Sequence, residues 1–218
     1  MPTPDRTSLD DIVRAGRDIL ETEGAAGLTM QAVAQRVGVR APSLYKRVKS
    51  RDDLIGLIAE STVDDLASRL SAAAMTQPRP DAREHLVALA HEFRAFALAN
   101  PAGFHLMFTP GPSVSRPDVT LLARAAEPLM EATAQLAGSD NALEAARTVT
   151  AWANGFISME LAGAFQLGGD VDRAFEFGIA RLATALAPDA LGPARSAGAE
   201  GADGAGALSV TMSRRQSS

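Results

Sequence analysis

The sequence predicts an all-α protein in which a three-helix head with a helix-turn-helix precedes a larger helical body. Two observations support this fold class. Valine and isoleucine recur at the spacing of helix faces, and no segment of useful length alternates apolar and polar residues as a half-buried strand does. Stretches rich in glycine and proline separate the amphipathic segments, as expected of turns between helices.

The composition sets broad limits on the class of protein. The chain has 218 residues, of which 46 % are hydrophobic and 22 % charged, so it is long enough for a small domain plus a larger one. The absence of cysteine excludes disulfides, thiol catalysis and cysteine-bound zinc. The N-terminal residues lack an apolar signal region, and no run of about 18 apolar residues occurs. We therefore expect a cytoplasmic protein with no membrane span.

The first two helices of the head are predicted from their capping residues. After an arm of residues 1–6, Thr7 or Ser8 suits the cap of a first helix, because two aspartates follow in its first turn. The stretch Gly-Ala-Ala-Gly at 24–27 is expected to end that helix. Thr29 then caps a second helix, whose inward side chains are Val33, Ala34 and Val37.

A tight turn at Gly38 leads into a third helix near residues 40–48. Glycine permits the positive φ that the turn requires, and Pro42 suits the first turn of the helix because its missing N–H is not needed there. Leu44 and Val48 point inward, whereas the basic and polar residues between them face outward. This pattern is typical of a DNA-binding helix-turn-helix, whose second helix enters the major groove.

The distribution of charge supports a local DNA-binding surface. The net charge is −5, so the chain as a whole is not a polycation. However, no acidic residue occurs between Glu23 and Asp52. That window contains all the lysines of the protein, and its basic residues are Arg36, Arg40, Lys46, Arg47, Lys49 and Arg51. A cationic patch of this kind attracts the phosphates of nucleic acid.

The body is predicted to consist of helices separated by breaks. Ser50 caps a long helix that runs through Leu70, with Asp53 completing a short version of the capping box. The proline-containing stretch 77–80 ends this helix, and Asn100-Pro101 stops the next one. Asp140 is a candidate cap for another long helix. The later helices are expected at 81–98, 118–137, 141–167 and 171–186.

These elements divide the chain into three parts. Residues 1–52 form the N-terminal arm and the DNA-binding head, and residues 53–187 form the body. Residues 188–218 are rich in alanine, glycine and serine and contain few large apolar side chains. Because such a segment cannot bury enough apolar surface to order itself, we expect a disordered tail.

The head resembles the TetR-type (TetR/AcrR) transcriptional regulators over roughly residues 8–57. The resemblance rests on Leu28-Thr29-Met30, Val37-Gly38-Val39, Ala41-Pro42-Ser43-Leu44-Tyr45 and Val48-Lys49-Ser50-Arg51-Asp52-Asp53-Leu54. It implies a three-helix DNA-binding head on a helical body that binds a ligand and forms the dimer. Two residues depart from the family pattern. Arg40 stands where a serine or threonine cap is common, and Val48 stands where an aromatic residue is common.

A second, weaker resemblance lies in the body. The sequence Trp152-Ala153-Asn154-Gly155-Phe156, followed by Met159-Glu160-Leu161-Ala162-Gly163, is similar to the WHG-type subset of these regulators. That subset usually has a histidine before the glycine. Asn154 occupies this place here, so a role tied to that histidine is not carried over.

The pattern and the resemblance together define a DNA-contacting set: Thr29, Gln31, Arg40, Ala41, Pro42, Ser43, Tyr45, Lys46 and Lys49. We expect Lys46 and Lys49 to contact phosphates. Arg40 reaches a base edge, such as guanine O6 and N7, or a phosphate. The resemblance gives Thr29 a phosphate contact besides its capping role. It also places Tyr45 at a phosphate, the alternative being a partly buried core position.

The large apolar residues of the body are candidates for the wall of an effector pocket, with His105 and Asn154 as orienting polar groups. The apolar candidates are Phe93, Phe96, Phe104, Phe108, Trp152, Phe156 and Met159. Taken singly, each of these is more typical of an ordinary core position. Glu160 lies in an otherwise apolar helix and is either a ligand group or a surface residue.

No enzyme, metal or cofactor site is predicted. His85, His91 and His105 lack the paired helical spacing of metal ligands, and no glycine-rich phosphate loop follows a strand. A nucleophile elbow is also missing from the sequence.

The sequence therefore predicts a homodimeric transcriptional repressor that binds a near-palindromic operator in double-stranded DNA. The last two helices, at 141–167 and 171–187, are expected to form the dimer interface. A small, largely apolar effector is expected to bind in the body. Two alternatives remain open. One is an activator or a regulator without an effector, and the other is a helical enzyme or ligand-binding protein with a vestigial head.

Overall fold

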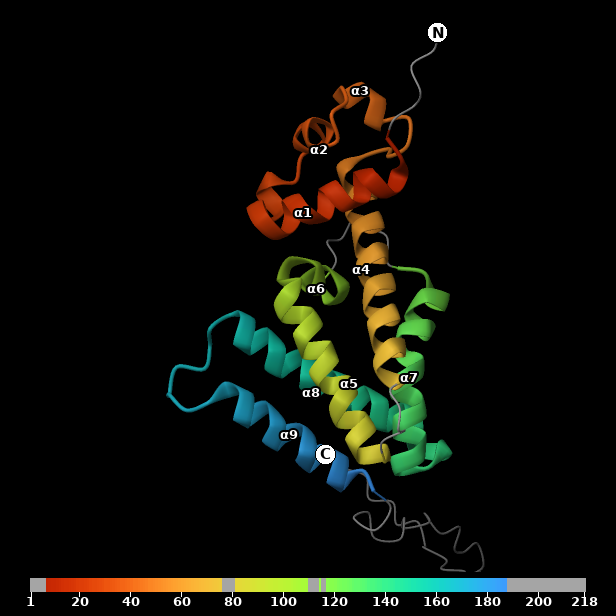
Figure 1. Cartoon of the computed structure of the whole chain (residues 1–218), viewed down its shortest axis with the longest axis vertical. Helices are drawn as coiled ribbons and strands as arrows, with labels where there is room; N and C mark the ends of the chain where they lie inside the picture. The colour runs from red at the N-terminus through yellow and green to blue at the C-terminus, as the bar shows by residue number, and fades with distance from the viewer. Residues whose placement is uncertain (1–6, 76–80, 110–113, 115–116, 188–218) are drawn as a thin grey trace, which may run out of the picture.

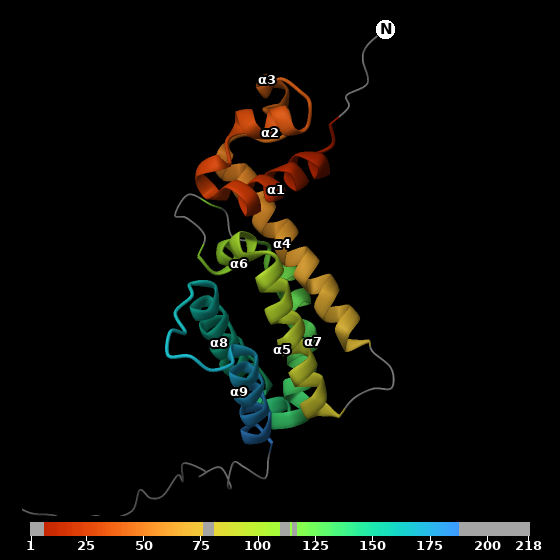
Figure 2. The ribbon, with the colours of Figure 1, turned by 60° about the vertical axis from the view of Figure 1, so that its left-hand side comes forward.

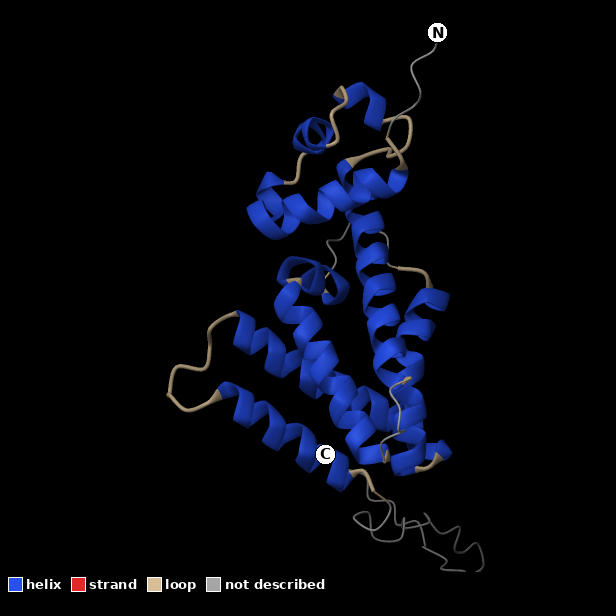
Figure 3. Cartoon of the chain, in the orientation of Figure 1, coloured by secondary structure: helices blue, strands red, loops and turns tan. Residues whose placement is uncertain are grey.

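The computed structural model describes residues 7–75, 81–109, 114 and 117–187, and every regular element within these ranges is helical (Figure 3). The all-α prediction is confirmed. The expected arm at 1–6 and the expected disordered tail at 188–218 lie outside the described residues. None of the described helices is both long enough and apolar enough to cross a membrane.

The helices form a small head on an elongated body (Figures 1 and 2). The head contains α1 (Leu9–Gly27), α2 (Met30–Arg36) and α3 (Ala41–Leu44), and α4 (Arg51–Ala74) runs from the head down the body. The remaining elements of the body are α5 (Ala82–Ala99), α6 (Pro101–Phe108), α7 (Val119–Ala137), the short 3-10 turn Ser139–Asn141, α8 (Ala142–Leu161) and α9 (Val171–Ala185). Helix α6 lies at the end of the body that meets the head.

The predicted caps of the head are confirmed. The Ser8 hydroxyl accepts the N–H of Asp11 at 3.0 Å, and the Asp11 carboxylate accepts the backbone N–H of Ser8 at 3.2 Å. The hydrogen bonds from Ser8 lower the pKa of Asp11 below its usual value, because they stabilise the charged carboxylate. Thr29 caps α2 by accepting the N–H of Ala32 at 3.1 Å. The predicted stop at 24–27 is a break at Gly24, with φ of 73°, followed by one further turn of α1.

The predicted cap of α4 is also confirmed, and the structure adds a cap for α5. The Ser50 hydroxyl accepts the N–H of Asp53 at 3.0 Å. The Asp53 carboxylate in turn accepts the N–H of Lys49 at 2.7 Å, one residue before the cap. At α5, Asp81 accepts the N–H of Glu84 at 2.8 Å, and Glu84 completes a full capping box.

Two predicted helices have different limits in the structure. The helix expected near 40–48 is only the single turn α3, followed by non-helical turns at 45–47. The helix expected at 141–167 spans Ala142–Leu161, so the predicted Asp140 cap and the predicted end were wrong. Asp140 lies in the 3-10 turn instead. Helix α8 ends early because Gly163 adopts φ of 63°, which lets Ala164 donate its N–H to the Met159 carbonyl at 2.9 Å.

Two hydrophobic cores share α4. The head core is built from α1, α2, α3 and the first turns of α4, which contribute Leu54, Ile55 and Ile58. The body core includes Leu66 and Leu70 from the later turns of the same helix. The expected domain boundary at 52/53 falls at the start of α4, and the helix then serves both cores. Because one helix belongs to both, the head cannot reorient without bending or tilting α4.

An ion network centred on the buried Arg94 joins α5, α8 and α9. Arg94 of α5 donates through Nε and one terminal nitrogen to Glu160 at 2.8 and 2.5 Å, and it also contacts Asp172 at 2.6 Å. Its guanidinium lies over the Phe175 ring, 5.0 Å from the centroid. The hydrogen bonds that Arg94 donates to Glu160 raise the pKa of Arg94 further, because they stabilise the charged guanidinium. The sequence left two roles open for Glu160, a ligand group or a surface residue. The structure shows instead that Glu160 is the ion-pair partner of the buried Arg94.

We expect Gly178→Ala to destabilise the fold. An added Cβ would lie inside the van der Waals envelope of the Trp152 indole, where α8 and α9 pack together. Overpacking typically costs about 1–3 kcal/mol, which exceeds the helical gain of alanine over glycine of about 1 kcal/mol. Urea unfolding measures the loss. The matched control is a double-mutant cycle with Trp152→Phe, which removes the clashing ring atoms. Strict additivity of the two effects would contradict this packing.

Candidate nucleic-acid interface and effector cavity

The tip of the head presents the predicted DNA-contacting residues to solvent. Of that set, Ala41 is half-buried and the others are exposed. Gly38 has φ of 75°, as the predicted turn requires. The buried side chains of this segment are Leu44 and Val48, which pack in the head core as predicted. The helix-turn-helix lies at the outer end of the molecule, away from the body (Figure 1), and its predicted DNA-contacting residues are accessible there.

Tyr45 is a surface residue. Its side chain is 54 % exposed, so the alternative of a partly buried core tyrosine does not hold. It lies directly after α3, beside Lys46. Arg40 stands at the N-cap of α3, where it makes no capping hydrogen bond, and it is exposed to solvent.

The basic residues of the acid-free window have different roles. Arg51 donates to two backbone carbonyls of the α1–α2 connection, Leu28 at 2.7 Å and Ala25 at 2.5 Å, so it holds the head together. Arg36 is 3.6 Å from Glu23. Among the residues that the structure describes, no ion pair uses Lys46 or Lys49. These two lysines keep their full charge available to a ligand.

The head meets the body at the N-terminus of α6. Asn100 provides no side-chain cap for this helix. Instead the Glu21 carboxylate of α1 accepts the N–H of Ala102 at 3.0 Å and of Gly103 at 2.8 Å. A Cβ at Gly103 would lie 3.2 Å from a Glu21 carboxylate oxygen, so glycine permits this close approach. A carboxylate at a helix N-terminus is favoured by the helix dipole.

A second contact strengthens the same joint. Arg17 of α1 donates to Asp65 of α4 at 3.1 Å and to the Asn100 side-chain oxygen at 3.4 Å. It also donates to the Ser61 hydroxyl of α4 at 3.4 Å, so its partners come from the helix that both cores share and from the residue before α6. Helices α1, α4 and α6 are therefore linked by polar contacts as well as by packing.

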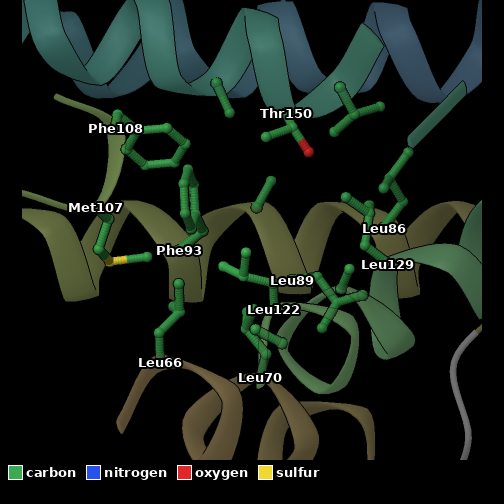
Figure 4. Close-up of a pocket in the computed structure, with 15 residues that line it drawn as sticks. Leu66, Leu70, Leu86, Leu89, Phe93, Met107, Phe108, Leu122, Leu129 and Thr150 are labelled. Carbon is green, nitrogen blue, oxygen red and sulfur yellow. The ribbon is translucent and has the colours of Figure 1, made fainter. Parts of the chain in front are cut away.

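The body contains an apolar cavity of about 210 Å³ that is partly open to solvent (Figure 4). Its walls come from α4, α5, α6, α7 and α8, and Thr150 is the single polar residue among the described side chains that line it. The larger lining side chains are Leu66, Leu70, Leu86, Leu89, Phe93, Met107, Phe108, Leu122 and Leu129. Such a lining suits an apolar ligand, because apolar surface leaves water favourably and few polar groups need partners.

A second hollow lies between α6 and the C-terminal part of α8. It is lined by apolar and polar side chains together: Pro101, Phe104, His105, Phe108, Thr109, Asn154, Ser158, Leu161 and Ala162. The side-chain oxygen of Asn154 is buried here without a hydrogen-bond partner among the described residues. Phe108 lines both this hollow and the apolar cavity.

The structure separates the predicted effector-binding residues into three groups. Phe93 and Phe108 line the cavity, and Phe104, His105, Phe108 and Asn154 line the second hollow. Trp152 and Phe156 pack against the Phe175 ring instead, at centroid distances of 5.1 and 5.3 Å, and Phe96 is buried in the body core. Met159 is 49 % exposed. Sequence reasoning missed the leucines of the cavity, because core and cavity leucines share the same helical spacing.

The fold and the two sites define a class: a helix-turn-helix protein whose body contains a ligand-sized cavity. Residues 12–58 match the family model described as bacterial regulatory proteins of the tetR family. Residues 86–182 match the model described as the tetracyclin repressor-like C-terminal domain. The chain belongs to the TetR family. The resemblance of the body to the WHG-type subset stays a prediction.

Known proteins of this family are similar over much of the chain. The HTH-type transcriptional regulator Rv1816 of Mycobacterium tuberculosis is 33 % identical over 107 residues, which are 49 % of this chain and 46 % of the relative. The chain thus matches about half the length of the first curated relatives. The crystal structure of SCO4313 is 30 % identical with a TM-score of 0.66, covering 79 % of this chain and 93 % of that one. BioQ with its natural double-stranded DNA operator is 25 % identical with a TM-score of 0.60, covering 84 % and 99 %.

We expect Glu21→Gln to destabilise the protein by about 1–2 kcal/mol, because a charged acceptor of two backbone N–H groups is replaced by a neutral one. Urea unfolding measures this change. The matched control is Glu23→Gln, two residues along the same helix. Glu23 is exposed, and its ion pair with Arg36 is long, at 3.6 Å. Removing its charge should therefore cost no more than about 0.5 kcal/mol. Equal effects of the two variants would mean that Glu21 does not hold α6.

Proposed function

We propose that this protein is a sequence-specific DNA-binding transcriptional repressor that acts as a homodimer and is released from its operator by a small, largely apolar effector. The observation that carries this proposal is the exposed cationic tip of the head. Arg40, Lys46 and Lys49 project from a helix-turn-helix whose surroundings contain no acidic residue from 24 to 51. Family membership and the similarity to BioQ, which was solved with its operator, support the same function.

Different side chains of the head are suited to contact different parts of the DNA. Lys46 and Lys49 serve as phosphate contacts, which contribute affinity without sequence information. Arg40, at the start of the short α3, is placed to contact a base edge, and Thr29 at the start of α2 faces a phosphate together with the free N–H groups there. One head alone offers few contacts to the DNA. A second head on a near-palindromic half-site, about one helical turn or more away, supplies the rest.

The outer faces of α8 and α9 are the proposed dimer interface. They expose Leu143 (44 %) and Phe177 (63 %), which a monomer would leave in water. Gly155 is also exposed on α8, and an added Cβ there would meet nothing within 4 Å of the single chain. Small residues at such a position allow two helices to approach closely. Four helices, two from each subunit, would then bury this surface.

The cavity and the head are connected through α4 and α6. Leu66 and Leu70 of α4 and Met107 and Phe108 of α6 line the cavity, and Glu21 of the head holds the other end of α6. An effector that fits the cavity better in one arrangement of α6 and α4 would favour that arrangement of the heads. It changes DNA affinity only through this difference in its own affinity for the two states.

The DNA-binding surface is tested by Lys46→Ala. We expect the variant to bind DNA more weakly whatever the base sequence. The plot of log affinity against log salt should become shallower by about 1 unit for each phosphate that a subunit no longer neutralises. The measurement is binding to the DNA upstream of its own gene, compared with a scrambled duplex, over a salt series.

The matched control for this measurement is Arg83→Ala, which removes a positive charge at the far end of α5 from the head. It should leave the slope unchanged. If Lys46→Ala keeps the wild-type slope, Lys46 does not bind a phosphate. If the protein binds no DNA even at low salt, the repressor function is wrong.

The dimer interface is tested by Gly155→Arg. An arginine at this exposed helical position fits the single chain and improves helix propensity by about 1 kcal/mol, so the subunit should remain folded. In the dimer it would place two cations in a close helix contact, and we expect sedimentation velocity to show monomers. Ala88→Arg on the exposed side of α5 is the control. A dimer that persists in Gly155→Arg would exclude this face.

A further inference from the structure

The apolar cavity and the second hollow share a wall. Phe108, at the last position of α6, lines both spaces. We propose that the two spaces form one binding site for a neutral amphiphile, which places its hydrocarbon part in the cavity and an uncharged hydroxyl or amide N–H at Asn154. This inference rests on the proposed function, since it names the chemical class of the effector that the body would recognise.

Helix α8 supplies the polar side of this site. Thr150 lines the cavity, whereas Asn154 and Ser158 line the second hollow. These residues are spaced at four-residue intervals, so they lie on one face of the helix about 6 Å apart. A molecule that extends by one helical turn from the cavity therefore passes from an apolar lining to hydrogen-bonding groups.

Asn154 is the observation that points to a ligand. Its side-chain oxygen is buried and has no hydrogen-bond partner in the described part of the chain. A buried acceptor without a partner destabilises the fold unless something donates to it. A hydroxyl or N–H of a bound molecule would provide that donor. Asn154 thus offers an acceptor to a bound molecule that can donate a hydrogen bond.

The charge of the ligand follows from the lining. Among the described residues, no aspartate, glutamate, lysine or arginine lines either space, and His105 at the outer hollow is the single titratable side chain. The buried Arg94 of α5 is already paired with the carboxylates of Glu160 and Asp172, so its charge is compensated. An ionised ligand would lose its hydration without gaining a counter-ion. The site therefore favours neutral molecules over carboxylates and amines.

Phe108 is suited to move when such a molecule binds. Its side chain is 41 % exposed, and on its covered side it faces the rings of Phe93 at 6.3 Å and Phe104 at 5.1 Å between centroids. Turning the ring would join the two spaces. Because Phe108 ends the helix whose first amides are held by Glu21, its displacement is transmitted along α6 toward the head.

The test uses the full chain and three probes with the same eight-carbon chain: 1-octanol, octanoate and octylamine. Isothermal titration calorimetry without DNA should show that octanol binds at least about tenfold more tightly than either ion, because only the alcohol enters without an unpaired charge. Octanoate or octylamine binding as tightly as octanol would overturn the proposed ligand class. No heat with any of the three probes would overturn the site itself.

Two variants separate the two halves of the site. Asn154→Leu removes the unsatisfied acceptor, so the protein should melt at a higher temperature yet bind octanol about tenfold more weakly. Thr22→Val, on the exposed side of α1 and outside both spaces, is the matched control and should bind as wild type. Ala126→Phe fills the cavity from its exposed edge and should abolish binding.

Unchanged octanol affinity in Asn154→Leu would remove Asn154 from the site, and unchanged affinity in Ala126→Phe would remove the cavity. These titrations contain no DNA, so they can fail while operator binding succeeds. Conversely, a protein that binds octanol as expected but binds no DNA would retain the ligand site and lose the repressor function.

Discussion

The carboxylate of Glu21 is the contact on which the arrangement of head and body depends. It accepts the first free amides of α6, which has no cap of its own, and it reaches them from a helix about eighty residues earlier in the chain. Head and body are therefore joined by a charge-assisted interaction at a helix end, where the dipole strengthens it. An apolar contact in this place would tolerate sliding, whereas two directional hydrogen bonds fix the position of α6 against α1.

Helix α4 connects this contact between head and body to the wall of the cavity. The same helix carries Leu54 and Ile58 into the head core and Leu66 and Leu70 into the wall of the cavity. Close-packed interiors transmit displacement rather than absorb it, so a change in the cavity is felt at both ends of α4. The buried Arg94 network fixes α8 and α9 against α5 on the other side. On one side of the body, α5, α8 and α9 are thus held together by ion pairs. On the other side, α4 and α6 border a cavity.

The predicted fold was correct where local chemistry decides it. Ser8, Thr29, Ser50 and Asp81 each begin a helix by accepting an N–H from the next turn, an interaction encoded within four residues. Errors arose where an end depends on longer contacts. Asp140 has the right chemistry for a cap yet lies in a 3-10 turn, and α8 stops at Leu161 because the backbone turns at Gly163.

The sequence by itself determined the helical class, the helix-turn-helix and its exposed cations, because periodicity, caps and the acid-free window are local properties of the chain. Only the tertiary structure decided which apolar side chains enclose space and which fill it. Phe96 and Phe108 have the same chemistry, yet one is core and the other borders two hollows. Packing between helices distant in sequence makes that difference. It also pairs Glu160 with Arg94 and brings Glu21 to α6, and neither pairing follows from a local pattern.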